Sequence, residues 1–194
     1  MVDLITNFLT ADIRTATPLL LAALGLVFSE RAGIVNIGTE GIMLIGALLG
    51  CVGASFSGSS LVGALTAIFG GLVMSLIFAF FTITLRSNQI VVGTAFNIFA
   101  GGFTITLNRL LLNGAKVKGY VNLPVPGLSK IPVAGDVLFN WSLPVYFAFI
   151  CVPLCWFVLQ RTNIGLKVRA VGEYPKACDT VGINVFRIRY GAVL

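Results

Sequence analysis

The sequence has no histidine and very few charged residues, so most of the usual catalytic and metal-binding side chains are missing. Its 194 residues include 13 basic and seven acidic side chains, together 10% of the chain, whereas a soluble domain carries about a quarter. A phosphate-binding G-x-x-x-x-G-K-[ST] loop is also missing, and cysteines and carboxylates do not occur at metal-ligand spacings. The sequence therefore predicts no catalytic residue, no metal, no cofactor and no enzyme activity.

Long apolar runs dominate the sequence, with 57% hydrophobic residues and a mean hydropathy of +0.99. A membrane crossing needs about 20 apolar residues, and such runs occur at 15–29, 34–54, 61–85, 90–112 and 141–159. All five are predicted to be helices, because a lipid-exposed backbone must satisfy its own hydrogen bonds. We expect an all-α fold, a polytopic transmembrane helical bundle of five spans and the start of a sixth, as one truncated domain over 1–194 in a lipid bilayer.

The net charge of +6 comes from basic residues that lie between the apolar runs, so it indicates membrane orientation and not a nucleic-acid partner. Six basic residues fall in the segment 160–190, which the positive-inside bias places in the cytoplasm. By alternation the proline-rich segment 113–140 is then predicted to be an external loop. The chain ends just as another apolar segment begins, so we expect the N-terminal part of a longer protein.

The second predicted span carries Asn36 and Glu40, four residues apart and so on one helix face. A charge at the centre of a span costs about 2.5–3.5 kcal/mol, so Glu40 should face the bundle interior, a partner or water. One interpretation is that both residues line a transport pathway. The other is that Glu40 lies near the inner boundary, where it pairs with Arg31 or caps a local break made by nearby glycines, which are Gly33, Gly38 and Gly41.

The fourth predicted span carries a stripe of small and polar residues at helical spacing, formed by Gly93, Asn97, Gly101, Thr104 and Asn108. Such a face lets another helix approach closely and offers side-chain hydrogen bonds, so helix packing explains it. Asn97 is the exception that we expect to meet substrate as well.

The segment 165–185 resembles the cytoplasmic loop of bacterial ABC-importer permeases, whose pattern is R-A-x-G-x-x-P-x-A-A-x-x-x-G-I. Seven residues match this pattern, and Cys178 stands in place of its second alanine; they are Arg169, Ala170, Gly172, Pro175, Ala177, Gly182 and Ile183. The resemblance implies that this loop couples the chain to an ATPase, through Arg169, Gly172, Glu173, Pro175, Lys176, Ala177 and Gly182. A short helix over about 174–181, with basic flanks, would suit a groove in a soluble partner.

The segment FSERAGIVNIGTEGIMLIGA at 28–47 is similar to the start of the same permeases, in the branch for simple sugars, nucleosides and branched-chain amino acids. Glu40 and the segment 87–104 resemble the nucleoside or simple-sugar members. The resemblance implies an importer permease of the bacterial cytoplasmic (inner) membrane. Its partners would be cytoplasmic ATP-binding subunits, a second permease subunit, identical or related, and an extracellular or periplasmic solute-binding protein.

Two other functions remain open from the residues alone. An ion-coupled secondary transporter would use Glu40 as a proton or cation site and would need no ATPase. A membrane scaffold without a solute path would use the polar faces for helix association only. The identity of the solute depends on pocket geometry across several helices, which the sequence does not specify.

Overall fold

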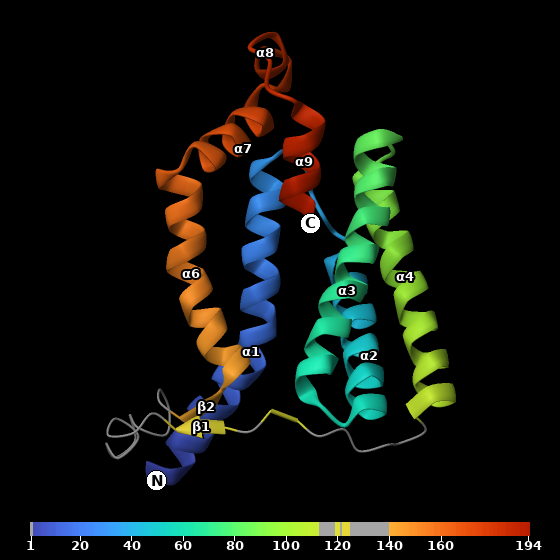
Figure 1. The fold of residues 1–194 in the computed structure, drawn as a ribbon, viewed down its shortest axis with the longest axis vertical. Helices are drawn as coiled ribbons and strands as arrows, with labels where there is room; N and C mark the ends of the chain where they lie inside the picture. The colour runs from blue at the N-terminus through green and yellow to red at the C-terminus, as the bar shows by residue number, and fades with distance from the viewer. Residues whose placement is uncertain (1, 113–118, 121, 125–139) are drawn as a thin grey trace. The chain divides into compact units, whose positions relative to one another are not determined.

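The computed structural model describes residues 2–112, 119–120, 122–124 and 140–194, and this part holds five helices long and apolar enough to cross a membrane (Figure 1). These spans are α1 (Val2–Arg31), α2 (Thr39–Ser57), α3 (Ser60–Ala79) continued by the π-helical turn η1 (Phe80–Thr84), α4 (Gln89–Leu107) continued by η2 (Asn108–Leu112), and α6 (Leu143–Arg161). The predicted all-α polytopic fold and the count of five spans are confirmed.

Two predicted span boundaries are wrong. The first helix begins at Val2 and not near residue 15, because polar residues before the apolar run fit a helix: the Thr10 hydroxyl donates to Thr6 O at 2.7 Å. The second helix begins at Thr39 and not at 34, because Gly33 ends α1 with a φ of +80°.

The turn at Gly33 is a Schellman motif. The N–H of Gly33 donates to Glu30 O at 2.9 Å, and the N–H of Ile34 donates to Ser29 O at 3.0 Å. A left-handed backbone conformation at this position costs little free energy only for glycine. The chain then continues through a non-helical segment, 32–38, before α2 starts.

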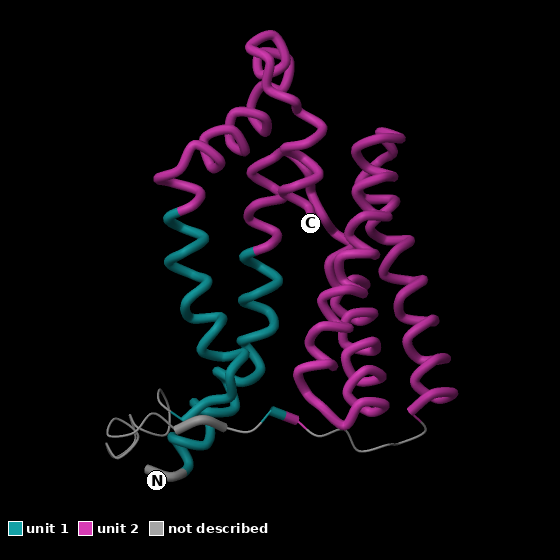
Figure 2. Tube along the Cα trace, viewed as in Figure 1, with its two compact units in different colours: residues 1–24, 120–157 teal, residues 25–119, 158–194 magenta. Residues whose placement is uncertain are grey.

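The described chain divides into two compact units (Figure 2). Unit 1 comprises Met1–Leu24 and Tyr120–Phe157, and it adds a small antiparallel sheet of β1 (Asn122–Pro124) and β2 (Asn140–Ser142) to its helices. Unit 2 comprises Gly25–Gly119 and Val158–Leu194 and contains every predicted site residue. The single domain over 1–194 stays a prediction. Most of the predicted external loop, 113–140, lies outside the described residues.

Within unit 2, α2 and α3 form a closely packed helical hairpin. Small residues allow the contact: a Cβ on Gly63 would lie 2.7 Å from Ala54 Cβ, and one on Gly50 would lie 3.1 Å from Ala67 Cβ. The Thr66 hydroxyl also donates across the interface to Leu49 O at 3.0 Å. This hairpin supports α4, which packs on α2.

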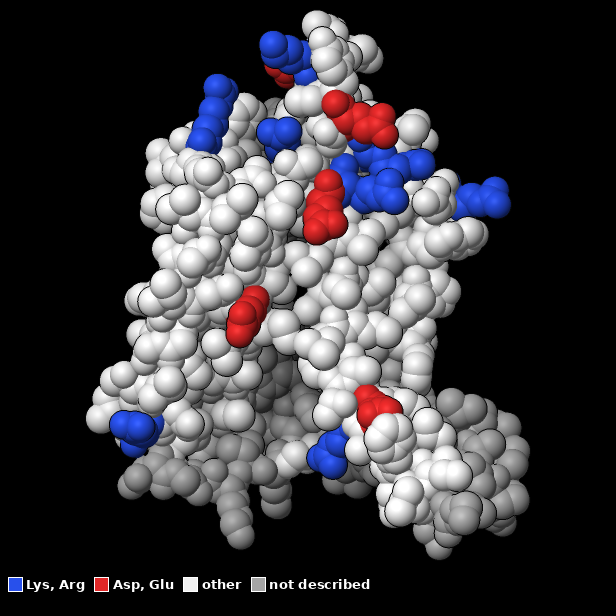
Figure 3. Space-filling model, turned by 180° about the vertical axis from the view of Figure 1, so that it is seen from behind, with Lys and Arg blue, Asp and Glu red and all other residues white. Residues whose placement is uncertain are grey.

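The predicted cytoplasmic segment 160–190 folds into three short helices, α7 (Asn163–Glu173), α8 (Pro175–Thr180) and α9 (Val185–Val193). The short helix predicted at about 174–181 is confirmed as α8. The sequence interpretation did not separate α7 and α9, although both begin with a side-chain cap: Thr162 accepts from Gly165 N and Asn184 accepts from Arg187 N. On the face shown in Figure 3, most of the coloured Lys and Arg side chains gather at the end of unit 2 that carries these helices.

Candidate functional site

The predicted pathway residues Asn36 and Glu40 lie on two different kinds of backbone, so the prediction that they share one helix face is wrong. Asn36 lies in the non-helical segment 32–38 and is 9% exposed, whereas Glu40 lies in the first turn of α2 and is exposed. A break of the helix is present after Gly33, but no side chain caps α2 at Gly38, so the alternative that Glu40 caps the break stays a prediction. Among the described residues Glu40 forms no ion pair with Arg31, so its side chain is left beside the helix N-terminus.

Asn97 of α4 holds the start of α2. Its Oδ1 accepts a hydrogen bond from Gly41 N at 2.8 Å, and its Nδ2 donates to Ile37 O at 3.1 Å. The first N–H groups of a helix have no partner within the helix, and the N-cap residue Gly38 has no side chain to supply one. Asn97 therefore caps the start of α2 from the neighbouring helix α4.

Glycines allow α4 to approach this segment closely. A Cβ on Gly93 would lie 2.8 Å from Gly38 N, and one on Gly41 would lie 2.9 Å from Phe96 O. Gly93 and Asn97, two residues of the predicted packing stripe, thus contact the start of α2. Further along the same stripe, a Cβ on Gly101 would meet no described atom within 4 Å, so Gly101 itself makes no close helix contact in the described chain.

Two side chains that the sequence interpretation missed also fix this segment. Gln89, the first residue of α4, accepts from Val35 N at 2.7 Å through its Oε1, and the buried Ser29 hydroxyl donates to Ile34 O at 2.9 Å. No local sequence pattern predicts these two hydrogen bonds, because each joins a side chain to a backbone group that only the fold brings within reach. Together with Asn97 they hold segment 34–41 between α1 and α4.

The start of α2 lies beside the first turns of α4, because Gly93 approaches Gly38 and Asn97 binds Gly41. A helix N-terminus carries a partial positive charge and free N–H donors. Asn36 adds a buried Oδ1 that has no hydrogen-bond partner in the described chain. Hydrogen-bond donors and acceptors thus meet at the start of α2.

The predicted ATPase-coupling residues divide into a partly buried group that makes contacts within the unit and an exposed group. Gly172 packs under the end of α1, where a Cβ would lie 2.1 Å from Arg31 O. Arg169 is bound within the unit, donating to Gly165 O and to Gln160 Oε1, each at 3.4 Å. These two residues therefore position α7 and do not face outward.

The outward-facing group lies on and beside α8. Glu173, Lys176 and Ala177 are exposed, as predicted for residues that meet a partner, and Pro175 is half-buried at the start of the helix. Tyr174 and Val181, which the sequence interpretation did not select, are 63% and 78% exposed. Tyr174 and Val181 flank α8 and the exposed Ala177 lies within it, and these three residues together are called the apolar stripe of α8 below.

The ends of α8 are defined by Pro175 and Gly182. Pro175 occupies the first helical position, where its missing N–H costs nothing. Gly182 has a φ of +82°, and the N–H groups of Gly182 and Ile183 donate to Asp179 O and Cys178 O, both at 3.0 Å. This is again a Schellman motif, so the glycine is required by the backbone conformation that ends the helix.

Comparisons with known proteins agree with this geometry. Residues 8–194 match the family described as branched-chain amino acid transport system / permease component. The chain is 39% identical to the guanosine ABC transporter permease protein NupQ of Bacillus subtilis, with 100% of this chain and 64% of the relative covered. It is 40% identical to the nucleoside ABC transporter permease protein NupC of Lactococcus lactis, with 92% and 60% covered.

A third relative is the putative glucose ABC transporter permease protein TsgC13 of Haloferax volcanii, which is 38% identical, with 97% of this chain and 58% of the relative covered. The chain thus spans less than two thirds of the length of each of these three relatives. No solved structure matches the chain.

Proposed function

The chain belongs to the family of branched-chain amino acid transport system permease components, and from this we propose that it serves as the transmembrane permease subunit of an ATP-binding-cassette importer. The proposed cargo is a nucleoside or simple sugar, moved into the cytoplasm, because three similar proteins are named as guanosine, nucleoside and glucose permeases. The proposed location is the bacterial cytoplasmic membrane. The observation that carries the proposal is the exposed apolar stripe of α8, held on a basic helical segment.

The proposed partners follow from this function. Cytoplasmic ATP-binding subunits would receive α8 in a groove, with Tyr174, Ala177 and Val181 as the apolar contact and Glu173 and Lys176 as polar neighbours. A second permease subunit would complete the solute path, and an extracellular or periplasmic solute-binding protein would deliver the cargo. The chain itself would need no cofactor and would carry out no chemistry.

The start of α2 is the proposed polar station on the solute path. Nucleosides and sugars carry several hydroxyl groups, which both donate and accept hydrogen bonds. Glu40 offers carboxylate acceptors, Asn36 offers its unpartnered Oδ1, and the α2 N-terminus offers backbone donors. Asn97 belongs to the same station as the residue that positions it. Such a mixture suits a neutral polyhydroxylated cargo.

A mechanical connection joins α8 to this station through contacts within unit 2. Gly172 of α7 lies against the carbonyl of Arg31, the last residue of α1, and a Cβ on Gly33 would touch the Gly172 backbone at 3.4 Å. Segment 34–38 follows directly and leads into Glu40. Movement of α8 by closing ATPase subunits would therefore be transmitted to the start of α2 through packed backbone, as in a rigid-body allosteric shift.

Co-purification tests the ATPase contact. Val181→Asp should abolish retention of the ATP-binding subunits, because it places a charge in the apolar stripe of α8. Thr180→Asp is the matched control: it adds the same charge at an exposed neighbouring position outside the stripe, and we expect it to retain the subunits. Equal retention by both variants would contradict the proposed docking surface.

Uptake measurements test the energy source. In cells with maintained ATP, uptake of the cargo should survive a protonophore and should fall when ATP is depleted. Uptake that stops with the protonophore while ATP stays high would instead support an ion-coupled carrier that uses Glu40.

A further inference from the structure

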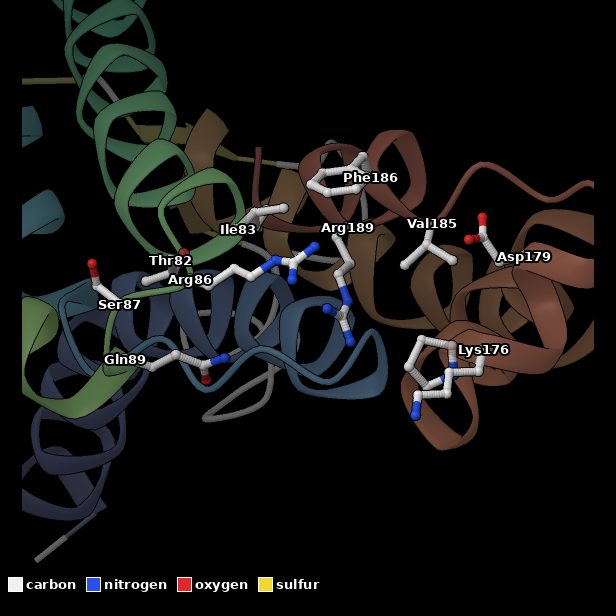
Figure 4. Close-up of a pocket in the computed structure, with 11 residues that line it drawn as sticks. Thr82, Ile83, Arg86, Ser87, Gln89, Lys176, Asp179, Val185, Phe186 and Arg189 are labelled. Carbon is white, nitrogen blue, oxygen red and sulfur yellow. The ribbon is translucent and has the colours of Figure 1, made fainter.

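A pocket of about 490 Å³ lies in unit 2, between the end of α3, the start of α4, and helices α8 and α9 (Figure 4). Its lining includes three basic side chains, Arg86, Lys176 and Arg189, and one carboxylate, Asp179, so the charged groups sum to +2. In Figure 4 the Arg86 side chain extends from the end of α3 toward Arg189 of α9. Basic side chains from three separate parts of the sequence thus surround one cavity.

The basic groups of this pocket lack partners within the described chain. None of the three cations forms an ion pair there, and the buried Nε of Arg189 has no hydrogen-bond acceptor. A buried donor without an acceptor costs free energy, and most such groups in proteins are satisfied. Like charges on Arg86 and Arg189 in one cavity add repulsion. Both costs are relieved by a bound anion with several oxygen acceptors.

The depth of the pocket places it among lipid headgroups. The span that contains α3 ends at Thr84, and Arg86 follows by two residues, while the next span begins at Gln89. The polar headgroup layer is roughly 5 to 7 Å thick on each side of the hydrocarbon core. Leu85 and Arg86 are not extended, with Arg86 at a φ of +52°, so Arg86 stays close to the end of the span and its long side chain is within reach of lipid phosphates.

The rest of the lining also suits a lipid. Ile83, Val185 and Phe186 place apolar side chains beside the cations, and Phe186 is 48% exposed. A free phosphate ion gains nothing from apolar walls, whereas the glycerol and first acyl carbons of a phospholipid do. Basic pockets between transmembrane helices are a recurring site for anionic lipid headgroups, and arginine matches phosphate geometry with paired donors.

We propose that this pocket binds the headgroup phosphate of an anionic phospholipid, with Arg86 and Arg189 as the phosphate ligands and Lys176 as a third positive charge. Because the pocket is lined by both α8 and the span ends, the lipid braces α8 against the membrane-spanning part of unit 2. The site is separate from the proposed solute station, and lipid binding is measured without transport.

The test is lipid retention by the full-length protein assembled with its own subunits in nanodiscs. The discs contain phosphatidylcholine with or without phosphatidylglycerol, and the lipid bound to the released protein is counted by native mass spectrometry. Each of Arg86→Asn and Arg189→Gln should weaken phosphatidylglycerol binding about fivefold. The pair should weaken binding more than either single variant, and because both side chains share one phosphate the two losses need not multiply. Asparagine suits position 86 because Arg86 has a φ of +52°, a conformation that asparagine tolerates.

Arg187→Gln is the matched control, because Arg187 is exposed on the same helix as Arg189 but does not line the pocket. It should leave phosphatidylglycerol binding within twofold of wild type. An equal loss from Arg187→Gln would show general surface attraction and overturn the proposal. Arg189→Lys keeps the positive charge and should keep most of the phosphatidylglycerol binding. If Arg189→Lys and Arg189→Gln lose this binding equally, and thermal unfolding shows that both are folded, the charge argument fails.

A second arm distinguishes lipid phosphate from free phosphate. Inorganic phosphate added to the protein in phosphatidylcholine discs should not shift the unfolding temperature, whereas phosphatidylglycerol should raise it in wild type and not in the Arg86→Asn, Arg189→Gln pair. Stabilisation by inorganic phosphate alone, with no effect of phosphatidylglycerol, would overturn the assignment of the site to a lipid.

Discussion

The side chain of Asn97 and the backbone of Gly41 meet across 56 residues of sequence, with Gly41 N 2.8 Å from Asn97 Oδ1. This bond lets α2 begin without a side-chain cap of its own, because α4 supplies the acceptor. The same amide donates to Ile37 O, so one side chain satisfies backbone on both sides of the helix start. The polar station around Glu40 depends on this arrangement.

Replacing Asn97 should therefore disturb both stability and transport. Asn97→Leu removes the partners of the Gly41 N–H and the Ile37 carbonyl, and the loss at the partly buried Gly41 N–H costs about 1–3 kcal/mol, whereas the exposed Ile37 carbonyl can bind water. We expect a lower unfolding temperature in detergent and loss of uptake. Asn108→Leu makes the same change at an exposed position near the end of this span and should leave both measurements near wild type. Unchanged uptake in Asn97→Leu would contradict the role of Asn97 in holding α2.

Two glycines on one face of α4 should respond differently to the same substitution. Gly93→Ala forces a Cβ to within 2.8 Å of Gly38 N, and backbone atoms on both sides must move apart. Gly101→Ala meets no described atom within 4 Å and should gain helix propensity of up to about 1 kcal/mol. Thermal unfolding of the two variants checks this order. The packing argument fails if Gly101→Ala proves the more harmful change.

Gly172 should tolerate no side chain, because its place under α1 leaves no room for one. Gly172→Ala would put a Cβ 2.1 Å from Arg31 O, so α7 must tilt away from the end of α1. We expect cargo-stimulated ATP hydrolysis to fall at least tenfold in the assembled importer. Gly191→Ala in α9 meets nothing within 4 Å and serves as the control. Normal stimulation in Gly172→Ala would show that coupling does not pass through this contact.

Substitution of Gly182 tests the effect of backbone conformation without a steric clash, since a Cβ there would meet no described atom within 4 Å. A left-handed conformation costs an ordinary residue about 1–2 kcal/mol, so Gly182→Ala should loosen the end of α8 and weaken ATPase association. Asparagine adopts this conformation more readily, so Gly182→Asn should recover much of the association. The measurement is the amount of ATP-binding subunit retained on purification. If alanine and asparagine behave alike, the conformation of Gly182 is not what matters.

Sequence alone was sufficient for the features that depend on local composition. Apolar runs of about 20 residues predict the spans, because lipid imposes one requirement on every backbone group, and the short helix at Pro175–Thr180 follows from a proline at its start and a glycine after its end. These properties require no knowledge of which helices are neighbours.

The tertiary structure decided how the site is assembled. Helical spacing placed Asn36 and Glu40 on one face, but segment 32–38 is not helical, so Asn36 lies outside α2 and Glu40 lies in its first turn. Likewise, Gly172 matched a coupling motif, yet its backbone lies against Arg31. The contacts of Asn97 with Gly41 and the convergence of Arg86 with Arg189 join residues far apart in the chain. Periodicity reports only neighbours along one helix, so contacts between helices become visible only once the chain is folded.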